Sequence, residues 1–114
     1  MEVEVLDIVL CEFYFSDLKS YKKRPVLVFK NNLPYNDFIA IPISSSIDKL
    51  YEDEYIINNI DLEIGSLPKE SKIMVRKTFV VSKDVVIKKY GTINQNSFKK
   101  YHKVFCNYFG CNKC

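Results

Sequence analysis

Pro25-Val26-Leu27-Val28-Phe29-Lys30 is a compact apolar run, rich in β-branched residues, that begins at a proline. Such a run predicts a short strand that is buried on both faces. Pro25 suits its first position, where a missing backbone N–H is tolerated. Turn-forming residues at 31–37 then separate it from a second apolar run at 38–44. We therefore expect two neighbouring strands of one sheet.

Similar runs on both sides of this pair predict more short strands, at residues 7–14, 54–58, 71–76 and 85–90. The last segment changes period, because aromatic residues recur there at helical spacing, with lysines mostly on the other side. This aromatic stripe consists of Phe98, Tyr101, Phe105, Tyr108 and Phe109. It predicts a helix over residues 94–109, with Asn94 or Asn96 as N-cap and Gly110 just after its end.

These elements predict a mainly β (α+β) protein, in which a small curled antiparallel sheet or half-open barrel is closed by a C-terminal helix. The 114 residues suit one domain over 1–114, with a Cys-bearing tail at 110–114. A chain of this length can bury a core without disulfides or metals. We expect its four cysteines to be reduced thiols.

The N-terminal segment does not look like a signal peptide, since Glu2, Glu4 and Asp7 interrupt it. No apolar stretch approaches the roughly 20 residues that span a bilayer. We therefore expect a soluble, cytoplasmic protein with no membrane partner. The formal net charge of +3 is weak evidence for a polyanion partner, but the basic residues are clustered.

One cluster precedes the central strand, where Lys19, Lys22, Lys23 and Arg24 follow one another closely. The guanidinium of Arg24 stays charged, and its fork of N–H donors matches phosphate oxygens. The lysines would steer a polyanion and contact flanking phosphates. The alternative is a solvated basic turn.

A row of hydroxyls, Ser44-Ser45-Ser46, ends the neighbouring apolar run. Ser44 is the first choice for a donor to the same phosphate, Ser45 is a register alternative, and Ser46 is a weaker contact. The alternative is that these serines only form a turn. Together, the guanidinium and the hydroxyls point to a nucleic-acid partner.

The order and spacing of several segments resemble one family. These segments are Asp7-Ile8-Val9-Leu10 with Phe13-Tyr14-Phe15-Ser16-Asp17; Lys22-Lys23-Arg24-Pro25-Val26-Leu27-Val28; Ile39-Ala40-Ile41-Pro42-Ile43-Ser44-Ser45; Leu67-Pro68 with Met74-Val75-Arg76; and Ile87-Lys88-Lys89-Tyr90-Gly91. Over about residues 6–93 the chain resembles the PemK/MazF-like toxins of type II toxin–antitoxin pairs.

The resemblance implies an SH3-like barrel of the CcdB/PemK-like kind with a C-terminal helix, assembled as a homodimer. It also implies an endoribonuclease, or mRNA interferase, that cuts single-stranded mRNA without a metal or cofactor. A cognate acidic antitoxin would occupy the RNA site. In such chemistry the RNA 2′-hydroxyl attacks the adjacent phosphorus, which leaves a cyclic phosphate and a 5′-hydroxyl.

The resemblance assigns roles to individual residues. Arg24 matches the family's loop arginine in R-P, and Ser44 matches its Thr or Ser after the third strand. Arg76 resembles an arginine that acts as charge stabiliser or acid in some members. Many members carry an Asp two residues later, where this sequence has Thr78. The general base is therefore open, and Asp17 is one possibility.

Three other hypotheses come from different classes. A gyrase-poison-like toxin of the same fold would bind protein without cutting RNA, although it would not need the Arg24–Ser44 pair. The missing Asp allows an inactive RNA-binding relative. The last is a zinc-stabilised module, because His102, Cys106, Cys111 and Cys114 have zinc-ligand chemistry. Their spacing matches no recognised finger, and we expect no metal.

Overall fold

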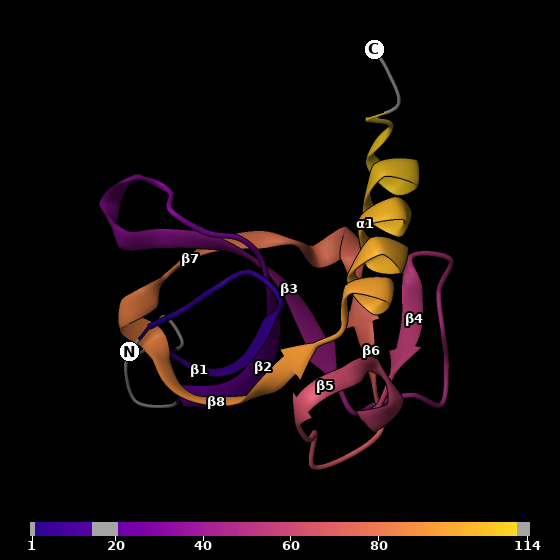
Figure 1. Ribbon diagram of the computed structural model, residues 1–114, viewed down its shortest axis with the longest axis horizontal. Coiled ribbons are helices and arrows are strands. Elements are labelled where there is room, and N and C mark those ends of the chain that lie inside the picture. The colour runs from indigo at the N-terminus through magenta and orange to yellow at the C-terminus, as the bar shows by residue number, and fades with distance from the viewer. Residues whose placement is uncertain (1, 15–20, 112–114) are drawn as a thin grey trace.

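The computed structural model describes residues 2–14 and 21–111, apart from the side chain of Tyr14. Eight strands precede one helix (Figure 1). The strands are β1 (Asp7–Tyr14), β2 (Tyr21–Lys30), β3 (Asp37–Ser44), β4 (Glu54–Ile57), β5 (Leu62–Gly65), β6 (Ser71–Met74), β7 (Phe79–Ser82) and β8 (Val86–Ile93). Short 3-10 turns are η1 (Pro34–Asn36), η2 (Asn59–Asp61), η3 (Val75–Lys77) and η4 (Lys83–Val85), and the helix is α1 (Gln95–Phe109).

The strands form one sheet in the order β4-β6-β3-β2-β1-β8-β5, and β7 also pairs with β3. All of these pairs are antiparallel. The sheet curls into a half-barrel, and α1 stands along one side of it, near β4 and β6 (Figure 1). The predicted fold class is therefore confirmed.

Strand β2 is the centre of the sheet, and both of its faces are buried. Leu27 points into a core with Ile8, Ile41 and Tyr101. Val26 and Val28 belong to a second core on the opposite face. All three β2 residues have no exposed surface. This alternation places one core on each side of the same sheet, as the apolar run predicts.

Helix α1 closes the first core. The side chain of Asn94 caps its first turn by accepting a hydrogen bond from the backbone N–H of Ser97 at 2.8 Å. Gly110 ends the helix in the left-handed conformation, at a φ of 72°. Tyr101 is fully buried, and its hydroxyl donates to the carbonyl of Ile56 at 3.1 Å. The aromatic stripe thus faces the sheet through Tyr101 and through Phe98 and Phe105, which contact Phe29.

The structure corrects several predicted elements. The basic residues 22–24 belong to β2 and not to a loop, because β1 is long enough to pair with them. The run predicted at 71–76 ends as a strand at Met74, and Arg76 lies in η3. Strands β5 and β7 were not predicted, since each has only four residues and mostly side chains that are not buried.

Among residues 2–14 and 21–111, no helix has the length and apolar character needed to cross a bilayer.

The buried hydroxyl of Tyr101 gives a test of the helix–sheet contact. Tyr101→Phe removes its hydrogen bond to Ile56 and leaves a buried carbonyl without that donor. We expect the free energy of unfolding to fall by about 1 kcal/mol, measured by urea denaturation. Tyr108→Phe is the control, because Tyr108 is exposed on the same helix. Equal stability of Tyr101→Phe and the wild type would show that this hydrogen bond does not stabilise the fold.

Candidate functional site

Arg24 and Ser44 lie side by side at one end of the sheet. The β2–β3 ladder pairs Val26 with Pro42, and the same register continued by two residues sets Arg24 opposite Ser44. Side chains two residues apart share a face of a strand, so both side chains lie on one face. They line a shallow depression of about 190 Å³. The structure thus brings together two residues that are 20 positions apart in the sequence.

The same depression collects most of the other predicted contacts. Its lining comprises Lys22, Lys23, Arg24, Pro25, Ile43, Ser44, Ser45 and Ser46. We call this set the basic depression. Lys22 and Lys23 are exposed, whereas Arg24 is half-buried. No carboxylate is among these described lining residues, so its field favours an anion.

The side chain of Arg24 has no hydrogen-bond or ion-pair partner within the part of the chain that the structure describes. Its Cα pairs with that of Cys11 across the β1–β2 ladder. Burial of the Cys11 thiol raises its pKa to about 12, so it stays neutral and does not compensate the guanidinium. A half-buried guanidinium without a counter-ion is suited to bind an anionic ligand.

Ser44 forms the turn that follows β3. Its Oγ accepts a hydrogen bond from the backbone N–H of Ser46 at 3.2 Å. This bond occupies a lone pair and leaves the O–H proton of Ser44 available to donate. The turn therefore orients a hydroxyl donor beside Arg24.

Arg76 is placed differently from Arg24. Its guanidinium donates to Oδ1 of Asp53 at 3.0 Å, and its backbone N–H donates to Oδ2 at 2.7 Å. The guanidinium also lies 5.5 Å from the ring centre of Tyr51. Arg76 does not line the basic depression. Thr78, found where many family members carry Asp, donates to the carbonyl of Val75 at 2.7 Å and ends η3.

Two predicted residues, Asp17 and Lys19, lie outside the described residues. Cys114, the fourth member of the zinc hypothesis, also lies outside them. His102 lies in the middle of α1, Cys106 in its last turn and Cys111 just after it, and Nδ1 of His102 is 3.8 Å from Sγ of Cys106. Within residues 2–14 and 21–111, no group of three or more His, Cys, Asp or Glu side chains is arranged to hold a metal ion. Cys11, Cys106 and Cys111 are free thiols.

A buried ion pair supports the strand end that carries Ser44. Nζ of Lys72 donates to Oε1 of Glu54 at 2.8 Å and to the carbonyl of Lys49 at 3.0 Å. Lys72 also pairs with Ser44 across the β3–β6 ladder. The pair therefore fixes the start of the loop after β3 from the opposite side of the strand. Sequence reasoning missed it, because Glu54 and Lys72 meet only when β4 and β6 pair.

The pKa of Glu54 reflects this pairing. Burial alone would raise its pKa, but the hydrogen bonds from Lys72 and from the backbone of Tyr51, with the positive charge of Lys72, lower it below its ordinary value. The carboxylate is thus kept charged in the folded protein.

Three solved structures share this fold over nearly the whole chain. One is an endoribonuclease in complex with its cognate antitoxin from a mycobacterial species, with a TM-score of 0.74, 13% identity, and coverage of 99% of this chain and 100% of that chain. An endoribonuclease from a mycobacterial species has a TM-score of 0.71 at 14% identity and covers 100% of this chain and 98% of its own. The Mycobacterium tuberculosis toxin MazF-mt6 has a TM-score of 0.67 at 14% identity, and the match covers 92% of this chain and 99% of that chain. The chain therefore shares the fold of these mycobacterial proteins.

The family follows from the sequence itself. The model of the PemK-like, MazF-like toxin of type II toxin-antitoxin system matches residues 4–109. Because this match spans most of the 114 residues, the chain belongs to that toxin family. The resemblance stated from the sequence is confirmed. A comparison with curated proteins gave no significant match.

The Glu54–Lys72 pair predicts a pH-dependent stability. Glu54→Gln leaves the Lys72 ammonium buried without its counter-ion, and we expect a loss of about 2–3 kcal/mol at pH 7 by urea denaturation. The folded-state pKa of Glu54 is lowered, so its contribution is present above the ordinary carboxyl pKa and is lost as the pH falls through the lowered value.

The wild type should therefore lose stability on acidification by more than Glu54→Gln does. The control is Glu63→Gln, which removes an exposed carboxylate. Parallel stability–pH curves for the wild type and Glu54→Gln would show that the ion pair contributes nothing.

Proposed function

We propose that this protein is the toxin of a type II toxin–antitoxin pair and cleaves single-stranded RNA without a metal ion. The observation that supports this most is the convergence of Arg24 and Ser44 in the basic depression. Two solved structures of the same fold are endoribonucleases, and the family match gives the toxin class.

The reaction uses a nucleophile that the substrate supplies. The RNA 2′-hydroxyl attacks the adjacent phosphorus, the bond to the 5′-oxygen breaks, and the products are a cyclic phosphate and a 5′-hydroxyl. Arg24 binds the non-bridging oxygens and neutralises the charge that develops on them. The Ser44 hydroxyl donates to the same phosphate, and Ser45 and Ser46 lie next to it. Lys22 and Lys23 attract the RNA and contact flanking phosphates.

Two proton transfers complete the reaction. No Asp, Glu or His lines the basic depression among the described residues, so we retain Asp17, seven residues before Arg24 in sequence, as the candidate general base. Arg76 is less suited to act on RNA than Arg24, because Asp53 already holds its guanidinium. Lys19 precedes Lys22 and Lys23 and is proposed to join them in binding phosphate.

The proposed partners follow from the same charges. An acidic antitoxin segment would be attracted to the basic depression and would block RNA, as the antitoxin-bound relative suggests. We also propose a homodimer in the cytoplasm, where mRNA is available.

A second candidate function is an inactive RNA-binding relative. It is favoured by Thr78, which caps η3 at the position where many family members carry Asp. In this case the protein would bind single-stranded RNA and leave it intact.

Cleavage assays decide between these functions. We expect purified protein to cut single-stranded RNA in excess chelator and to leave 5′-hydroxyl ends, detected by direct phosphorylation of the products. A single 2′-deoxy substitution at the cleaved position should stop the reaction, because it removes the nucleophile. Binding without cleavage would favour the inactive relative, and loss of activity in chelator would contradict the metal-free mechanism.

The Arg24 guanidinium should account for much of the rate. We expect Arg24→Ala to lower the single-turnover rate by about 100- to 1000-fold, as does removal of one donor to a developing oxyanion. Lys99→Ala is the control, because Lys99 is an exposed cation on α1. Both variants should melt close to the wild type. An Arg24→Ala variant that cuts as fast as Lys99→Ala would exclude Arg24 from the mechanism.

A further inference from the structure

A larger and more apolar pocket lies directly beside the basic depression. It has a volume of about 310 Å³, and its apolar wall includes Leu10, Pro25, Leu67 and Tyr90. Lys23 and Lys69 also line it. We call it the flanking pocket. It shares Lys23, Pro25 and Ser45 with the basic depression, so a ligand held by Arg24 can continue into it.

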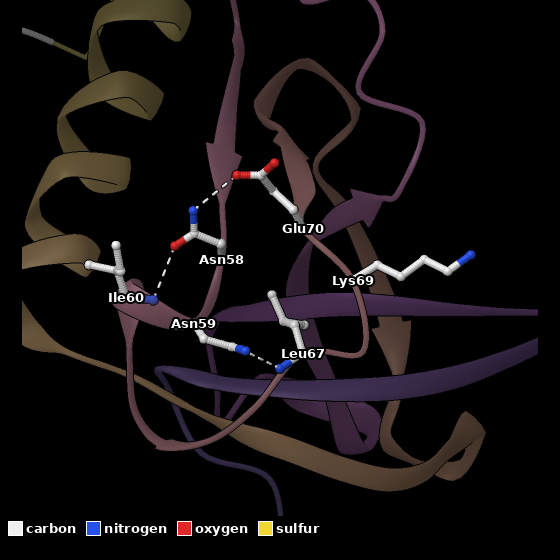
Figure 2. Close-up of a pocket in the computed structure, with 6 residues that line it drawn as sticks. All are labelled: Asn58, Asn59, Ile60, Leu67, Lys69 and Glu70. Atoms are coloured by element: carbon white, nitrogen blue, oxygen red, sulfur yellow. Dashed lines mark hydrogen bonds between the residues drawn. The ribbon is translucent and has the colours of Figure 1, made fainter.

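One wall of the flanking pocket is a loop that the structure holds firmly. The backbone N–H of Leu67 donates to Oδ1 of Asn59 at 2.7 Å (Figure 2). Nδ2 of Asn58 donates to Glu70 at 3.1 Å, which ties the other end of the loop to β4 (Figure 2). These bonds form before any ligand arrives, so the wall is preformed.

The same loop is closely packed against Tyr90. Gly65 has a φ of +80°, and a Cβ built there would lie 2.1 Å from the carbonyl oxygen of Tyr90. The backbone N–H of Ser66 donates to that oxygen at 3.3 Å. Only glycine allows this approach, which brings the loop with Leu67 against the strand that carries Tyr90.

The side chain of Lys69 extends from this anchored loop and is accessible to a ligand. It is exposed, and it points away from Asn58 and Asn59 (Figure 2). The side chain of Lys69 forms no hydrogen bond or ion pair with any other described residue, whereas its carbonyl accepts from the hydroxyl of Ser71 at 3.0 Å. The flanking pocket thus combines two cations, Lys23 and Lys69, with an apolar wall that includes an aromatic ring.

Single-stranded RNA presents groups that match this combination, because each base lies between two phosphates. A base has flat apolar faces that stack on aromatic rings, and its neighbouring phosphates bind lysine. An acidic peptide with apolar side chains could also meet Lys23 and Lys69, but the flanking pocket shares Lys23, Pro25 and Ser45 with the depression that would hold the reacting phosphate. The continuity of the two pockets and their charges therefore favour RNA.

We infer that the flanking pocket binds the base of the nucleotide next to the phosphate held by Arg24, and that Tyr90 and Lys69 determine which RNA sequences are cut. This inference rests on the proposed ribonuclease function. Tyr90, over whose ring Nζ of Lys88 lies at 5.2 Å from the centre, supplies an aromatic surface for the base, and Lys69 binds the phosphate beyond it.

The test uses RNA in which single bases are removed. Once the wild type has defined a cleavage site in an unstructured RNA, an abasic residue is placed at each position around it, and kcat/KM is measured. We expect an abasic residue at one position adjacent to the cleaved linkage to lower the kcat/KM of the wild type roughly tenfold or more. In Tyr90→Leu the same abasic residue should lower kcat/KM by less than about threefold, because the intact base no longer has a ring on which to stack.

Matched variants separate stacking from folding. Tyr90→Phe keeps the ring and should behave as the wild type does in the abasic series. Lys69→Ala should reduce kcat/KM and its salt dependence, whereas Lys99→Ala should change neither. Lys69 is exposed, so Lys69→Ala carries the test if Tyr90→Leu proves unstable in thermal melts.

The outcomes distinguish failure of this inference from failure of the proposed ribonuclease function. If the wild type neither binds nor cuts RNA, the proposed function fails, and the inference fails with it. If the wild type cuts RNA and depends on Arg24, but the Tyr90 and Lys69 variants show the same abasic profile as the wild type, the inference alone is wrong. Protection of the pocket by an antitoxin peptide without any effect on base preference would likewise overturn it and assign the pocket to protein binding.

Discussion

The pairing of β2 with β3 is the constraint on which the rest of the molecule depends. Val26, Leu27 and Val28 are wholly buried, and they supply side chains to both cores. Burying both faces of a strand fixes its register, because a slip of one residue would exchange the two sets of side chains. That fixed register is what sets Arg24 beside Ser44, outside the cores and at the open end of the sheet.

The elements around this strand end hold it in place and determine which arginine has a protein counter-ion. On one side, the Glu54–Lys72 ion pair holds the strand that pairs with the last residues of β3. On the other, the loop with Leu67 is anchored to Asn59 and Tyr90 and forms the flanking pocket. Asp53 neutralises Arg76, and Arg24 is left without a protein counter-ion among the described residues. The two arginines therefore differ, because Arg76 is paired with a protein carboxylate and the Arg24 side chain has no such partner among the described residues.

The sequence predicted the parts of this arrangement that depend on local pattern. The buried strand at 25–30, the amphipathic helix with Asn94 as its cap, and the turn of serines after β3 all follow from residue type and spacing. The family resemblance then joined Arg24 and Ser44 across 20 residues, and the β2–β3 register places them together. The roles assigned to them stay predictions.

The features that were missed depend on contacts between distant elements. Strands β5 and β7 are four residues long and expose much of their surface, so their sequences carry little alternation. The basic residues 22–24 look like loop residues, but pairing with β1 extends the strand through them. Glu54 and Lys72 are 18 residues apart, and nothing in either local sequence shows that they meet. The flanking pocket likewise exists only because Gly65 lets its loop approach Tyr90.

The central claim is that Arg24 and Ser44 act on one phosphate, and a double-mutant cycle of single-turnover RNA cleavage tests it most directly. Rates are compared for the wild type, Arg24→Ala, Ser44→Ala and the double variant, each verified to be folded. If both groups contact the same phosphate, the double variant should lose much less than the product of the two single losses, because either change alone already misplaces that phosphate. Strictly multiplicative losses, or cleavage that neither substitution affects, would contradict the claim.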